Sequence, residues 1–170
     1  MTDQIAIATG AIVCADTIIH GQVTIGTGTV VHPQCRILAE KGPIVIGQNN
    51  ILAECVTIIN TSEEPLVIHN YNTFEVGSTC AGRSVGNHNV VEARGRILSG
   101  TVVGNHCVVG PMCATAENDT LEDHTVVFGE TMNRRTQTSN PKAQFALYAK
   151  HLKYLQDLLP RYNHLRKATA

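Results

Sequence analysis

A six-residue repeat runs through most of this chain and limits the folds that it can adopt. Between residues 85 and 127 an aliphatic side chain returns at every sixth position except one, where Thr115 replaces it. The aliphatic residues are Val85, Val91, Ile97, Val103, Val109, Leu121 and Val127. This period is neither that of a helix nor the alternation of a long strand. It predicts short strands separated by tight turns, in which three repeats close one triangular coil and successive coils stack through their backbone groups.

The same register starts near the N-terminus and is interrupted by short insertions. It begins at Ile7, and a break after Ile37 predicts a corner insertion over residues 40–43. A longer break predicts a protruding polar loop over residues 60–65. The count of repeats predicts about seven coils. We therefore expect an all-β parallel β-helix over residues 1–133, with Gly104 and Asn105 as examples of turn residues that tolerate positive φ.

The pattern changes after residue 133, where we expect a connector, one α-helix and a short tail that belong to the same domain. Ser139, Asn140 and Pro141 form a typical helix start, and the apolar spacing predicts a helix over about residues 141–159. Pro160 is expected to end the helix. The tail from Tyr162 to Ala170 is expected to be frayed.

The predicted helix carries two apolar stripes. The inner stripe, expected to pack lengthwise on the β-helix, consists of Phe145, Tyr148, Ala149, Leu152, Leu155 and Leu159. The outer stripe lies beside it and consists of Leu147, Tyr154 and Leu158. One flat sheet face would leave the outer stripe in water, so we interpret these three residues as a candidate partner-binding surface.

Charge divides the chain at the same point as the repeat. Residues 1–133 hold five Lys and Arg against thirteen Asp and Glu, whereas residues 134–170 hold eight against one. The basic residues of the C-terminal part are interleaved with Leu and Tyr beside an acidic β-helix, which argues against nucleic-acid binding. The sequence has no apolar run long enough for a membrane span and no signal peptide, so we expect a cytoplasmic protein.

The six cysteines lack the spacing of a metal or disulfide framework. They are Cys14, Cys35, Cys55, Cys80, Cys107 and Cys113. No CxxC pair occurs among them, and they fall on repeat positions. We interpret all six as small buried residues in a reducing compartment.

The repeat resembles the hexapeptide, or left-handed parallel β-helix, family, which contains acyltransferases and γ-class carbonic anhydrases. The segment Pro65-Leu66-Val67-Ile68 resembles the end of a long loop in the carbonic-anhydrase branch. Aligned through that loop, the three zinc-ligand positions of the enzymes fall on Ile59, Val76 and Ala81. None of these side chains binds zinc. The resemblance therefore implies the scaffold of this branch without its metal, and no cofactor.

The histidines are weaker candidates for a metal-binding or catalytic site. His88, His106 and His124 occupy equivalent turns of successive coils and are expected to form a column, which lacks the convergent geometry that zinc prefers. His20, His32 and His69 are expected to point outward at corners. The loop over residues 60–65 has no histidine to act as the general base of an acyltransferase. We expect no catalytic residue, although a metalloenzyme and an acyltransferase remain the alternatives.

Several longer segments resemble a non-enzymatic branch of the fold, the dynactin subunit 6 family. The most specific are Gly42-Pro43-Ile44-Val45-Ile46-Gly47 and Arg134-Arg135-Thr136-Gln137-Thr138. The resemblance implies a structural subunit of the dynactin pointed-end complex that assists dynein-driven cargo transport along microtubules. It implies as partners dynactin subunit 5, an actin-related protein and a large zinc-containing subunit, and a cytoskeleton-associated location.

Overall fold

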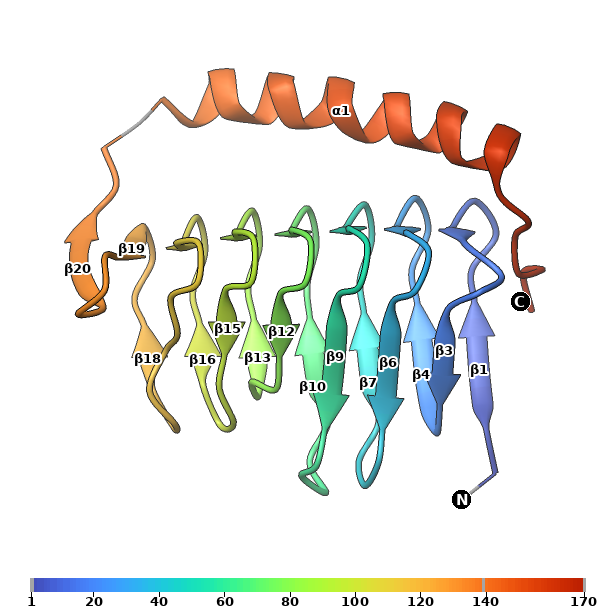
Figure 1. The fold of residues 1–170 in the computed structure, drawn as a ribbon, viewed down its shortest axis with the longest axis horizontal. Coiled ribbons are helices and arrows are strands. Elements are labelled where there is room, and N and C mark those ends of the chain that lie inside the picture. The colour runs from blue at the N-terminus through green and yellow to red at the C-terminus, as the bar shows by residue number, and fades with distance from the viewer. Residues whose placement is uncertain (1, 139, 170) are drawn as a thin grey trace.

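The chain winds into a parallel β-helix with one long helix along its side (Figure 1). A computed structural model describes residues 2–138 and 140–169. The coils advance from the N-terminus to the last repeat, and α1 (Pro141–Tyr162) runs back over them toward the first coil. The C-terminal residues consequently lie beside the N-terminal coil, although they are far away in sequence.

Three sheets form the sides of the prism, and their order confirms about seven coils. The seven-stranded sheet contains β1 (Gln4–Ile7), β4 (Gln22–Ile25), β7 (Ile44–Ile46), β10 (Leu66–Ile68), β13 (Ser84–Val85), β16 (Val102–Val103) and β18 (Thr120–Leu121). The five-stranded sheet contains β3 (Ile18–His20), β6 (Arg36–Ala39), β9 (Thr57–Asn60), β12 (Thr79–Cys80) and β15 (Arg96–Ile97).

The eight-stranded sheet is the face that lies beneath α1. It contains β2 (Ile12–Val13), β5 (Val30–Val31), β8 (Ile51–Leu52), β11 (Thr73–Phe74), β14 (Val90–Val91), β17 (Val108–Val109), β19 (Thr125–Phe128) and β20 (Asn133–Thr136). All pairings in this sheet are parallel except that of β19 with β20, which is antiparallel. The connector that we predicted from residue 134 thus begins inside a strand, and this strand covers the edge of the last coil.

The predicted register is confirmed by the core. Ile97 and Val109 point into the prism with exposed fractions of 0% and 1%, and Thr115, which breaks the aliphatic pattern, is also buried. Val91 and Val109 pair across neighbouring coils, so the inward residues stack in columns. Burial of each such side chain contributes about 1.5–3 kcal/mol, and the stacked columns hold the coils together.

The turns differ from the prediction in which residue adopts positive φ. In the turn before β17, His106 has a φ of 56°, whereas Gly104 and Asn105 do not have positive φ. Gly104 is needed for space, because a Cβ there would lie 2.5 Å from Asp123 Oδ1. The Asn105 backbone N–H donates to the same Asp123 oxygen at 2.7 Å, which links neighbouring coils.

The helix begins where the sequence predicts but ends later. Asn140 caps it by accepting a hydrogen bond from the Lys142 backbone N–H, and Pro141 is its first residue; Ser139 lies outside the described residues. The predicted end before Pro160 is wrong, since the helix continues to Tyr162. Pro160 removes one donor from the last turn, and Asn163 caps that turn through its backbone and side-chain N–H groups on Leu159 O.

The predicted fraying of the tail is also wrong for residues 162–169, whereas Ala170 lies outside the described residues. Leu165 forms an antiparallel bridge with Cys14, and the Arg166 backbone N–H donates to Val13 O at 2.8 Å. The Arg166 guanidinium donates to the Thr17 side-chain and backbone oxygens. The tail therefore covers the first coil, where the β-helix would otherwise leave backbone groups unpaired.

The prediction for the cysteines is correct at five positions and wrong at one. Cys14, Cys35, Cys80, Cys107 and Cys113 are buried, whereas Cys55 is exposed. Cys55 occupies a turn at a φ of 60°, where its side chain points away from the core. Burial raises the pKa of the Cys35 and Cys80 thiols to about 12, so these thiols remain protonated and unreactive.

Candidate functional site

The positions that hold zinc in the enzyme relatives lie on two different parts of the prism. Ile59 and Ala81 follow paired residues of β9 and β12, whereas Val76 is an exposed turn residue after β11. All three are aliphatic and offer no ligand atom. Within residues 2–138 and 140–169 no group of three or more His, Cys, Asp or Glu side chains is placed to hold a metal ion.

The predicted histidine column exists, and a tyrosine extends it. The corner column consists of Tyr71, His88, His106 and His124, whose rings stack with centroid distances of 5.0, 4.9 and 5.0 Å and interplanar angles of 3–4°. Such a parallel stack cannot converge on one ion. Phe145 of α1 packs edge-on against His88 at 5.5 Å and against Tyr71 at 5.6 Å, so the column contributes to holding the helix.

The other histidines do not all point outward as predicted. His20 is exposed beside Asp3, and His69 is exposed, in agreement with the prediction. His32, however, is only 7% exposed, and its Nδ1 lies 3.0 Å from Glu54 Oε1. Its side chain lines the space between the eight-stranded sheet and α1.

The inner stripe packs on the first coils through its C-terminal half. Leu152, Leu155 and Leu159 are buried against Val30 and Ile51 on the outer face of the eight-stranded sheet. The C-terminal half of α1 is thus attached by apolar contact.

Polar contacts hold the same helix to the corner of the prism. Tyr148 Oη donates to Asn49 O, and Gln156 Nε2 donates to Gly28 O at 2.8 Å. The remaining inner-stripe residues differ from the prediction: Ala149 is exposed, and Phe145 is 44% exposed because it meets the corner column rather than the sheet.

The outer stripe is largely uncovered. Leu147 is 72% exposed and Tyr154 is 58% exposed, whereas Leu158 is half-buried. The structure brings these three residues to one flank of α1, as predicted. Leu147 and Tyr154 therefore form an exposed apolar surface on this flank.

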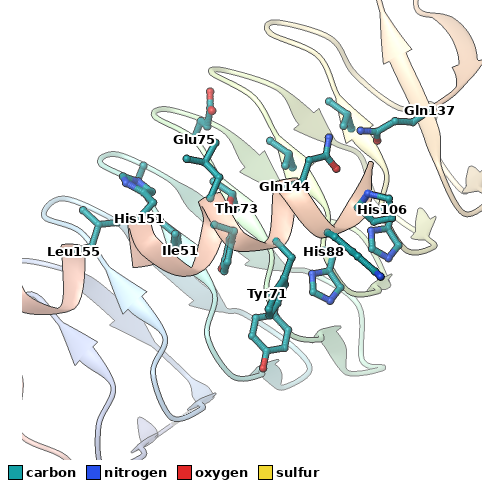
Figure 2. Close-up of a pocket in the computed structure, with 18 of the residues that line it drawn as sticks. Ile51, Tyr71, Thr73, Glu75, His88, His106, Gln137, Gln144, His151 and Leu155 are labelled. Carbon is teal, nitrogen blue, oxygen red and sulfur yellow. The ribbon is translucent and has the colours of Figure 1, made fainter. Parts of the chain in front are cut away.

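A large groove separates the N-terminal half of α1 from the eight-stranded sheet. This helix groove has a volume of about 1020 Å³, and its floor contains Ile51, Thr73, Val90 and Val108. Figure 2 shows Tyr71 and His88 on one side of α1 and Glu75 on the other. Leu147 and His151 also line the groove, so one end of the outer stripe forms part of its wall.

The groove floor was not identified from the repeat, although a signal exists. In the seven parallel strands of the eight-stranded sheet, the residue that precedes the inward residue points outward, and it is aliphatic in all of them except β11. These residues are Ile12, Val30, Ile51, Thr73, Val90, Val108 and Val126. The equivalent positions of the other two sheets mix polar residues such as Thr24, Arg36 and Ser84 with aliphatic ones such as Val45, Val67 and Val102. The nearly unbroken aliphatic row distinguishes the face beneath α1.

Comparison with solved structures defines the class of the fold. A hexapeptide transferase family protein from Anaplasma phagocytophilum aligns with a TM-score of 0.67 over 93% of this chain and 92% of its own, at 12% identity. A putative acetyltransferase from Bacillus cereus aligns with a TM-score of 0.65 over 91% of each chain, at 15% identity. The protein is thus a hexapeptide-repeat protein with the left-handed parallel β-helix fold. At these sequence identities the structural similarity establishes the fold but gives no information about activity.

Sequence relatives identify the family within this class. No protein-family model matches the chain. Dynactin subunit 6 of Nematostella vectensis is 39% identical over 98% of this chain and 94% of its own length. Dynactin subunit 6 of Danio rerio is 38% identical over 96% and 88%, respectively. The chain belongs to the dynactin subunit 6 family.

Proposed function

We propose that this protein is a non-catalytic scaffold subunit of dynactin. The observation that carries the proposal is the similarity to dynactin subunit 6 along nearly the whole chain. We place the protein in the pointed-end complex, beside dynactin subunit 5, the actin-related protein and the large zinc-containing subunit. In that position it assists dynein-driven transport along microtubules as a cytoplasmic, cytoskeleton-associated protein. In the described part of the chain, no helical segment is both long and apolar enough to cross a membrane.

The chemistry of the site supports a scaffold over an enzyme. Ile59, Val76 and Ala81 provide no zinc ligand, so the metal-bound water of a carbonic anhydrase has no support at these positions. The corner column is engaged in ring stacking and in contact with Phe145. A stack of coils is instead rigid and offers long flat surfaces for assembly.

We propose that the outer stripe is one of the surfaces used in assembly. Leu147 and Tyr154 are exposed on a helix that its own β-helix already holds through Leu152 and Leu155. A companion subunit that covers the outer stripe would remove this apolar surface from water without disturbing the packing beneath it.

Metal content and activity test the scaffold proposal against the enzyme alternatives. Zinc in the purified protein is measured by elemental mass spectrometry, and CO₂ hydration and acetyl transfer from acetyl-coenzyme A are assayed on the same sample. The scaffold predicts substoichiometric zinc and rates equal to those of buffer. One zinc per chain together with CO₂ hydration, or acetyl transfer above background, would show that the protein is an enzyme and not a non-catalytic scaffold.

A further inference from the structure

The aliphatic row on the eight-stranded sheet extends beyond the part that α1 covers. Under the inner stripe, Val30 and Ile51 have exposed fractions of 0% and 2%. Farther along the same row, Val90 and Val108 are half-buried and line the helix groove. The groove floor is therefore an apolar surface ready to receive further aliphatic side chains.

The groove is large enough for a segment of another protein. Its volume of about 1020 Å³ lies at the upper limit of the range for small-molecule pockets, which is about 300–1000 Å³. Leu147 lines the groove and also belongs to the exposed outer stripe. An occupant of the groove would therefore contact both the sheet and the flank of α1.

One carboxylate that lines the groove, Glu75, has a second carboxylate, Glu92, beside it on the next coil. Glu75 lines the groove, and Glu92 occupies the equivalent position on the next coil, since Phe74 pairs with Val91 immediately before them. Burial, and then the charge of Glu75, raise the pKa of Glu92. Glu75 accepts a hydrogen bond from a backbone N–H at 3.1 Å. In residues 2–138 and 140–169, neither carboxylate forms an ion pair with Lys or Arg.

Other charges at the groove do not neutralise this pair. Glu54 also lines the groove and contacts His32, and Lys142 and His151 lie on the helix side. The sheet side therefore retains a negative edge next to an apolar floor. A ligand that carries apolar groups with positive charges on one flank matches both features.

We propose that the helix groove binds a basic amphipathic helix of a companion protein. Aliphatic side chains of this helix contact Val90 and Val108, and its Lys or Arg side chains pair with Glu75 and Glu92. An anionic lipid would be repelled by the same carboxylates, and an uncharged ligand would leave them unpaired. This inference rests on the proposed scaffold function in one respect: the helix is taken to belong to a companion subunit.

A second copy of this chain is the alternative occupant. Its inner stripe is occupied, but its exposed outer stripe lies beside Lys150. The crosslinking experiment below distinguishes it from a companion subunit.

A binding assay with a model peptide tests the chemistry of the groove independently of dynactin. The probe is a fluorescein-labelled helical peptide of Leu and Lys, and its matched control has Glu in place of Lys. By fluorescence anisotropy, we expect the Lys peptide to bind at least about tenfold more tightly than the Glu peptide. In the double variant Glu75→Lys, Glu92→Lys this advantage should disappear, whereas Glu122→Lys, an exposed charge reversal on another sheet, should change the affinity by less than about twofold. Equal binding of both peptides, or an unchanged double variant, would overturn the proposal.

Photo-crosslinking in the assembled complex identifies the natural occupant. A benzophenone amino acid replaces Leu147 at the groove or, as a control, Val102, which is 36% exposed on the seven-stranded sheet. We expect crosslinks from position 147, and not from 102, to a basic amphipathic segment of a companion subunit. Crosslinks to a second copy or to an acidic segment would refute the inference while the scaffold function stood. If no dynactin subunits co-purify, the proposed scaffold function is refuted. The peptide assay then still tests whether the groove binds a basic amphipathic helix.

Discussion

Tyr148 of α1 donates a hydrogen bond to the backbone carbonyl oxygen of Asn49, a residue 99 positions earlier in the sequence. This contact holds the helix at one corner of the prism, where its N-terminal half stands away from the sheet and the groove remains open. We expect Tyr148→Phe to cost about 1 kcal/mol of unfolding free energy and to increase amide exchange in the N-terminal half of α1. Hydrogen exchange with mass spectrometry measures this. Unchanged exchange there would show that the apolar contacts of Leu152 and Leu155 suffice to hold the helix.

Inward residues should dominate stability. Ile97→Ala removes a fully buried side chain and should cost about 2–4 kcal/mol in denaturant unfolding, because it leaves a cavity. The matched change at the surface is His106→Asn, which retains a residue that tolerates positive φ and should cost less than about 1 kcal/mol. Similar losses for the two variants would contradict the assigned register.

The corner column should make stability depend on pH. Burial, and then the charge of His106, lower the pKa of His88, so the unfolded chain takes up this proton at a higher pH than the folded chain does. The contribution of neutral His88 to the free energy of unfolding is therefore complete above the ordinary histidine pKa of about 6.5, and it is lost as the pH falls below that value. We expect a lower melting temperature at about pH 5.5 than at about pH 7.5, with a smaller difference in His88→Asn. An equal difference in both proteins would exclude His88 as the cause.

The repeat predicted the prism well because each inward residue depends on one local rule. Ile97 and Val109 could be placed inside from spacing alone. The ends of the chain could not be predicted in this way, since Leu165 and Arg166 are ordered by contacts with the first coil, which local sequence does not reveal.

The helix and the groove show a second limit of the sequence. Pro160 was expected to end the helix, but packing of Leu159 and the cap from Asn163 stabilise a further turn. The outer stripe was predicted from helical periodicity, whereas the groove depends on how far α1 stands from the sheet. That distance follows from the contacts of Tyr148 and Phe145 with the corner, which are tertiary.

The outer stripe should be needed for assembly and dispensable for folding. Replacement of Leu147, Tyr154 and Leu158 together by Ser changes mostly exposed surface, so the isolated protein should melt close to the wild-type temperature while its incorporation into the complex is lost. The matched control is Leu152→Ala, which removes a buried contact and should lower the melting temperature. Normal incorporation of the triple variant, or a melt lowered as far as that of Leu152→Ala, would exclude this role.

Purification of the native protein is the decisive experiment on the proposed role of this chain as a scaffold subunit of dynactin. The protein is isolated from its own cells under mild conditions, and its companions are identified by mass spectrometry. We expect dynactin subunit 5, the pointed-end actin-related protein and the large zinc-containing subunit in constant proportion to this chain. Recovery of the chain without dynactin subunits would exclude the proposed function.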